Sequence, residues 1–144
     1  MKPLLRLMAA TVAGLLLGAM VNSGVLAAGV RLLPPPDGVD MGSMAGLQAA
    51  MPHLPASHLL APWLAHALGT FCGAWLASRL VPAGKWQGAL LVGLAFLAGG
   101  VMMAWQLPAP RWFELADIAL AYLPVAGLGH LLAQRARRPR AKAA

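Results

Sequence analysis

Charged residues are scarce in this chain of 144 amino acids. They make up only 10% of the residues, and just four of them are acidic. Ordinary soluble domains carry about 25% charged residues. With 60% hydrophobic residues and a mean hydropathy of +0.70, the composition excludes an ordinary soluble domain. It predicts a protein whose outer surface faces lipid.

Cysteine is nearly absent as well. Cys72 is the single cysteine, so the chain has no internal disulfide and its redox compartment is not indicated. The sequence also contains no HExxH zinc motif, no paired-cysteine metal motif, no phosphate-binding P-loop and no GxSxG nucleophile motif. These absences leave no residue to assign as catalytic and no cofactor to expect.

Apolar runs dominate what the sequence does contain. Four of them are long enough to cross a bilayer as helices, at residues 4–33, 58–80, 87–105 and 113–133. We therefore predict an all-α protein, an integral membrane four-helix bundle in one domain of residues 1–134, followed by a basic tail at 135–144. Pro124 lies inside the fourth run, where its missing amide should kink the helix or free a carbonyl.

The first run could alternatively be a signal peptide. Lys2 and Arg6 precede the apolar stretch, and the small residues before Ala28 are typical of a cleavage site. The stretch is longer than the apolar region of a usual signal peptide. We therefore predict that it stays in the protein as a membrane helix, which tilts or extends beyond the lipid.

Charges are sorted between the connections of the predicted bundle. The four acidic residues lie beside two connections: Asp37, Asp40, Glu114 and Asp117. Nine of the eleven basic residues lie at the other junctions: Lys2, Arg6, Arg79, Lys85, Arg135, Arg137, Arg138, Arg140 and Lys142. The exceptions are Arg31 and Arg111. Under the positive-inside rule, both termini are cytoplasmic in a multi-pass protein of the bacterial inner membrane. The basic tail then faces anionic lipid, so the expected partner is the bilayer and not nucleic acid.

The connection at residues 34–57 is expected to carry a short interfacial helix on the outer side. Asp40 is the predicted cap of this helix. Met41, Met44, Met51 and His53 also form a candidate Cu(I) set, because soft thioether ligands select that ion. A helix that covers the bundle or lies on the membrane explains the methionines as packing residues, and we favour this interpretation.

Small residues at four-residue spacing predict close helix packing. Gly14 and Gly18 form a GxxxG pair in the first span, and Gly69 and Gly73 lie on a similar stripe in the second. Such faces let helix backbones approach closely in lipid. The pattern leaves open whether they join helices of one chain or of two copies. Ala89, in the third span, is predicted to face lipid.

Polar residues within the apolar runs form the candidate functional site, because a polar side chain inside lipid is costly and is often functional. They are Asn22, His58, His66, Thr70 and Asp117. His58 and His66 are about 12 Å apart along a helix, too far to bind one metal ion. Asp117 is expected to pair with Arg111 or with one of these histidines. The alternative is that each polar group makes only a structural hydrogen bond across the bundle.

Three segments carry a resemblance to other proteins: Leu64–Thr70, Leu107–Phe113 and Ala116–Pro124. They resemble segments of small bacterial inner-membrane proteins of uncharacterised function with four helices. The resemblance covers about the last two thirds of the chain and implies the fold and location but no activity. The chain is not similar to small multidrug transporters, because those carry a glutamate in the first helix, where this sequence has only Asn22.

Two functions of different classes fit these observations. The first is a non-enzymatic bundle that binds or conducts a small solute or proton from the outer side along its polar residues. The second is a structural or assembly subunit, paired with a second copy or with other membrane subunits, whose polar groups only join helices. A less favoured alternative is an outer-face metal-dependent enzyme built from the outer carboxylates, His53 and His58.

Overall fold

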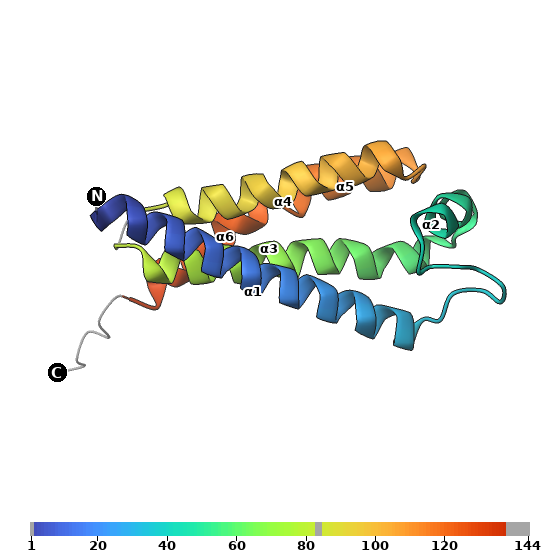
Figure 1. The fold of residues 1–144 in the computed structure, drawn as a ribbon, viewed down its shortest axis with the longest axis horizontal. Helices are drawn as coiled ribbons and strands as arrows, with labels where there is room; N and C mark the ends of the chain where they lie inside the picture. The colour runs from blue at the N-terminus through green and yellow to red at the C-terminus, as the bar shows by residue number, and fades with distance from the viewer. Residues whose placement is uncertain (1, 83–84, 138–144) are drawn as a thin grey trace.

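The protein is all-helical over the residues that the structure describes. The computed structural model describes residues 2–82 and 85–137, which contain helices and no β-strand (Figure 1). In chain order the elements are α1 (Lys2–Leu32), α2 (Met44–Ala50), η1 (Met51–His53), η2 (Ala56–Leu59), α3 (Leu60–Leu80), α4 (Gln87–Gln106), α5 (Arg111–Leu120) and α6 (Leu123–Arg135). The part of the predicted basic tail at residues 138–144 lies outside the described residues.

Four helical segments are long and apolar enough to cross a membrane. They are Lys2–Leu32, Ala56–Leu80, Gln87–Gln106 and Arg111–Arg135. The predicted all-α class and the four apolar helices are therefore confirmed for the described part of the chain. The 31 residues of α1 make a helix about 46 Å long, which exceeds the roughly 30 Å of a bilayer's hydrocarbon core.

Side chains on the outside of the helices are largely apolar. On α1, Leu5 is 69% exposed, Leu16 62% and Met20 72%. Exposure of such large side chains to water is unfavourable in proportion to their apolar area. Lipid removes that cost, so the surface of the folded chain agrees with a membrane environment.

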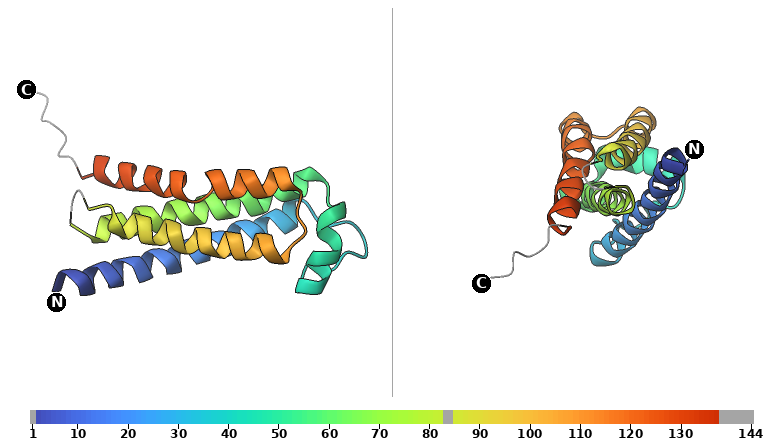
Figure 2. Two further views of the ribbon diagram at one scale, coloured as in Figure 1. Left: turned by 90° about the horizontal axis from the view of Figure 1, so that it is seen from above. Right: turned by 90° about the vertical axis from the view of Figure 1, so that its left-hand side faces the viewer.

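The central helix of the bundle is α3. The helices α1, α4 and α6 all pack against it, and α4 also packs against α6. Figure 2 shows α1 crossing the bundle obliquely, with α2 and its flanking loops across one end. Any polar group on α3 therefore lies close to several other helices.

Glycines allow α1 and α3 to pack backbone to backbone. A Cβ atom added to Gly73 would lie 2.5 Å from the carbonyl oxygen of Gly14, and one added to Gly18 would lie 2.7 Å from the carbonyl oxygen of Gly69. Both distances are shorter than a carbon–oxygen contact permits, so no larger residue fits without a shift. The two glycine stripes therefore meet within one chain.

Ala89 does not face lipid, which corrects the prediction made for it. Its side chain is 3% exposed and packs in a cluster with Ala74, Ala77, Val92 and Ala126. Small and apolar residues occur on every face of α4, so hydrophobicity alone gives no indication of which face meets α3. The buried face is the one where small residues allow close contact.

The cap of α2 also differs from the prediction. Ser43, not Asp40, is the N-cap, and its Oγ accepts a hydrogen bond from the Gly46 amide at 3.0 Å. Asp40 lies one turn earlier, and its carboxylate accepts from the Ser43 hydroxyl and from the Gly42 amide at 2.8 Å. These hydrogen bonds hold the pKa of Asp40 below its usual value, and the bond from the Ser43 hydroxyl has the largest effect. Asp40 thus positions the residue that caps the helix.

The fourth apolar segment is broken in two near Pro124, as predicted. The break lies at Ala121 and Tyr122, between the end of α5 and the start of α6. Pro124 occupies the first turn of α6, where its missing amide costs no helical hydrogen bond. Tyr122 has φ −115° and ψ −86°, which are not helical angles. The break therefore changes the direction in which the Tyr122 side chain leaves the backbone.

Arginines of α1 and of the turn after α6 bind the C-terminal end of α3. Arg6 Nε donates to the carbonyl oxygen of Leu80 at 2.7 Å. Arg137 donates to the carbonyl oxygens of Ser78 at 3.1 Å and Val81 at 2.8 Å, and also to that of Arg79. The last carbonyls of a helix lack partners within it and carry partial negative charge. These contacts tie α1 and the end of α6 to α3.

Candidate functional site

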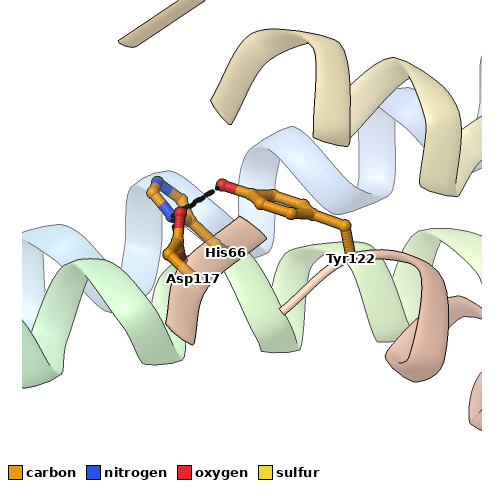
Figure 3. Close-up of polar contacts among 3 residues, drawn as sticks. All are labelled: His66, Asp117 and Tyr122. Carbon is orange, nitrogen blue, oxygen red and sulfur yellow. Dashed lines mark hydrogen bonds and ion pairs between the residues drawn. The ribbon is translucent and has the colours of Figure 1, made fainter. Parts of the chain in front are cut away.

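His66, Asp117 and Tyr122 form one hydrogen-bonded group inside the bundle (Figure 3). His66 Nδ1 lies 2.9 Å from Oδ1 and 3.0 Å from Oδ2 of Asp117. The Tyr122 hydroxyl donates to Asp117 Oδ2 at 2.6 Å and lies 3.0 Å from His66 Nδ1. The three side chains come from α3, α5 and the break between α5 and α6. We call them the triad.

The contacts of the triad determine which ring nitrogen carries the proton when His66 is neutral. An ionised carboxylate only accepts hydrogen bonds, so Nδ1 of His66 carries the proton that points at Asp117. Nε2 is then the acceptor nitrogen of the neutral ring. It lies on the side of the ring away from Asp117 and Tyr122 (Figure 3). The carboxylate therefore holds the ring while Nε2 stays available for a proton or for a hydrogen-bond donor.

Burial differs within the triad. The side chain of His66 is 22% exposed and that of Asp117 is 7% exposed. Tyr122 is 1% exposed, and its ring stacks on the His66 ring with centroids 5.7 Å apart. The carboxylate is thus largely buried, and the imidazole is the most exposed member of the triad.

Gly100 of α4 makes room for the tyrosine. A Cβ atom added at this position would lie 2.5 Å from Cζ of Tyr122 and would overlap its hydroxyl oxygen. The neighbouring Gly99 has no such contact, because nothing lies within 4 Å of its Cβ position. Gly100 therefore determines how closely the phenol approaches α4, and with it the place of the hydroxyl.

Two cavities meet at His66. The loop cavity, about 290 Å³, lies beneath α2 and is lined by residues that include Met51, His58, Phe113, Glu114 and Asp117. The side cavity, about 370 Å³, lies between α1 and α4, and its lining includes Asn22, Phe96 and Tyr122. His66, Gly100 and Met103 line both cavities. The imidazole is therefore part of the wall between them.

The predicted polar residues are divided among these surroundings. His66 and Asp117 are brought together, so Asp117 pairs with His66 and not with Arg111 or His58. His58 lines the loop cavity, and its Nε2 contacts the carbonyl oxygen of Pro34 at 3.1 Å. Asn22 lines the side cavity. Thr70 lines neither cavity; it is fully buried, and Oγ1 has no hydrogen-bond partner in the described part of the chain.

The candidate copper residues do not converge. Met41 and Met51 line the loop cavity, whereas Met44 is 41% exposed and outside its lining. His53 is exposed and belongs to a separate hollow lined by residues between Pro36 and Leu54. Within residues 2–82 and 85–137, no three His, Cys, Asp or Glu side chains come close enough together to hold a metal ion. This also removes geometric support from the metal-enzyme alternative.

Tyr122 and Gly100 are the site residues that the sequence did not identify. Tyr122 is the only tyrosine in the chain and follows Asp117 by five residues. In a continuous helix that spacing would place the two side chains on different faces. Only the break before Pro124 turns the phenol toward Asp117. The combination of an intramembrane carboxylate, a lone tyrosine and a following proline was the available signal.

A second histidine contact lies nearer the other end of the bundle. His130 Nδ1 lies 3.1 Å from the Ser78 hydroxyl. Ser78 is fully buried and follows His66 by twelve residues on α3, a rise of about 18 Å. The two histidines therefore have separate partners and do not share a site.

Fold and site together define a small all-helical protein with four helices capable of spanning a membrane and a His–Asp–Tyr group between them. Comparisons of the chain with models of protein families, with curated proteins and with solved structures found no match. The resemblance to small inner-membrane proteins therefore stays a prediction, and the function has to be argued from the site itself.

Proposed function

We propose that the chain is a multi-pass protein of the bacterial inner membrane that binds a small solute in the loop cavity from the outer side. Protonation of His66 sets the affinity. The observation that carries the proposal is the position of His66, whose Nδ1 is held by Asp117 while its ring lines the cavity.

The distribution of charge supports this orientation. The first and last described helix ends, with Lys2, Arg6 and Arg135, lie at the same end of the bundle (Figure 1). The connections at the opposite end hold Asp37 and Asp40. The positive-inside rule assigns the basic end to the cytoplasm, which places α2 and the loop cavity on the outer side.

The shape and lining of the loop cavity support solute binding. Binding sites for small molecules are mostly apolar hollows of about 300–1,000 Å³ with a few polar groups. At about 290 Å³ the loop cavity lies just below that range, and its walls are apolar apart from a few side chains such as His66, Glu114 and Asp117. It is suited to a small solute with an apolar body and one polar group.

Packing below the triad favours binding over conduction. Thr70, one turn further along α3, is fully buried, and the neighbouring Gly69 and Gly73 contact the α1 backbone. A proton or solute path needs a continuous series of polar groups or waters. The tight helix contact next to the triad supports a site that ends at His66.

The expected response to pH follows from the chemistry of His66. Protonation at Nε2 turns an acceptor into a donor and adds a positive charge at the cavity wall. Histidine is the side chain whose charge ordinarily changes between about pH 5 and 8. A solute that contacts this nitrogen is therefore expected to bind with different affinity at the two ends of that range.

Saturation-transfer NMR of the protein in lipid nanodiscs tests this function, with benzyl alcohol as the uncharged probe. We expect binding to differ about fivefold or more between pH 5.5 and 7.5, and His66→Gln and Asp117→Asn to remove the difference while the fold is kept. Ala104→Trp fills the loop cavity and should abolish binding, whereas Ala98→Trp on the exposed face of α4 should not.

Two outcomes would contradict the proposal. One is unchanged pH dependence in both triad variants. The other is equal binding to the Ala104→Trp and Ala98→Trp proteins, which would mean that the probe partitions only into lipid. If the triad variants also unfold, the triad serves to join helices, as expected of an assembly subunit.

A further inference from the structure

We infer that the solute of the loop cavity is a small organic cation, an apolar body that carries one positive charge. This inference rests on the proposed function and specifies its ligand. It starts from the charges of the cavity lining, which includes the carboxylates Glu114 and Asp117 but no lysine or arginine. Arg31 and Arg111, the arginines nearest to lining residues in sequence, are both exposed and outside the lining.

Among residues 2–82 and 85–137, no lysine or arginine pairs with either carboxylate. Asp117 is bound by His66 and Tyr122, which are both uncharged when the histidine is neutral. Glu114 is partly buried, and no hydrogen bond or ion pair of its side chain occurs among the described residues. Burial of a charge is unfavourable unless it is paired. A bound cation would supply the missing partner.

The rest of the wall suits the apolar part of such a ligand. Met41, Met51 and Met103 place polarisable thioethers around the cavity, and Phe113 adds an aromatic ring. Alkyl groups on an ammonium pack well on these surfaces, and an aromatic face attracts the cation itself. A hydrophilic metal ion would find no such match, because few oxygen ligands are present.

Protonation of the site opposes binding of a cation. His66 contacts Asp117 of α5 and Tyr122 at the start of α6. Asn22 of α1 lines the side cavity together with His66, as do Gly100 and Met103 of α4. Across the loop cavity lie Glu114 and His58. With both histidines neutral the cavity is net negative. Each histidine that is protonated at low pH adds one positive charge and makes the cavity less negative. The affinity for a cation therefore falls.

The test uses three probes that share a benzene ring and differ in charge: benzyltrimethylammonium, benzyl alcohol and benzoate. The charge of benzyltrimethylammonium does not change with pH, so any pH effect on its binding comes from the protein. At pH 7.5 in nanodiscs of uncharged lipid, we expect the cation to bind at least tenfold more tightly than the alcohol and benzoate to bind weakest. At pH 5.5 the affinity for the cation should fall severalfold, and His66→Gln should reduce that fall.

Glu114→Gln keeps the shape of the side chain and removes its charge, so it should weaken binding of the cation about tenfold and leave the alcohol unaffected. Asp37→Asn removes an exposed carboxylate in the connection between α1 and α2, outside the cavity lining; it is the matched control and should have no effect. Equal affinity for the cation and the alcohol would overturn the cation inference and leave solute binding intact. Equal effects of Glu114→Gln and Asp37→Asn on binding of the cation would do the same. If Ala104→Trp changes the binding of none of the three probes, both the cation inference and the proposed solute binding are overturned.

Discussion

At the scale of single residues, the position of the Tyr122 hydroxyl depends on the absence of a side chain at Gly100. The phenol fills the space that a Cβ atom would need, and its hydroxyl donates to the carboxylate that holds His66. A hydrogen bond to a charged group contributes about 1.5–3 kcal/mol. Gly100 therefore acts on the triad indirectly, as a positioning residue.

A double-mutant cycle of Gly100→Ala and Tyr122→Phe tests this coupling. Gly100→Ala should lower the free energy of unfolding in detergent by about 1–3 kcal/mol, because the added methyl group displaces the phenol. Tyr122→Phe should cost less in the Gly100→Ala protein than in the wild type, since it removes the hydroxyl oxygen, the atom closest to the added methyl group. Gly99→Ala, with open space at its Cβ position, is the control and should have little effect. Additive losses would show that Gly100 and Tyr122 are independent.

At the scale of helices, the sequence predicted which elements exist better than how they are turned. Spacing alone selected the glycines of α1 and α3 that meet in the structure. Ala89 was placed on the wrong face, because in a helix that is apolar all round the lipid-facing and buried sides have similar residues. The break before Pro124 was predicted, but its consequence for Tyr122 was not, since that depends on the backbone angles within the break.

Substitution of Gly73 tests the contact between α1 and α3. Gly73→Leu should separate the two backbones and lower the thermal unfolding temperature clearly, with a cost of about 1–3 kcal/mol or more. Gly24→Leu introduces the same side chain on α1 where nothing lies within 4 Å, and it should leave the unfolding temperature nearly unchanged. Equal unfolding temperatures of the two variants would mean that α1 and α3 do not meet along this face.

At the scale of the whole molecule, charge and packing divide the bundle into two different ends. At one end, Arg6 and Arg137 bind the last carbonyls of α3 and hold α1 and the turn after α6 against it. At the other, α2 covers a cavity that reaches His66. The positions of the charges in the sequence predicted which connections lie at the same end of the bundle. This prediction requires only the number of helices that cross the membrane. The cavity depends on the angles at which the helices separate, and no local sequence pattern predicts those angles.

The central claim is that the cavity with His66 opens to the outer side of the membrane. Labelling of single cysteines in intact cells with a membrane-impermeant methanethiosulfonate tests it most directly, in a Cys72→Ser background. Ile118→Cys lines the loop cavity and should react with reagent added outside, whereas Ala136→Cys at the opposite end should react only after the membrane is opened. Reaction of Ala136→Cys from outside, with Ile118→Cys protected until the membrane is opened, would contradict the proposed orientation and the outer binding site together.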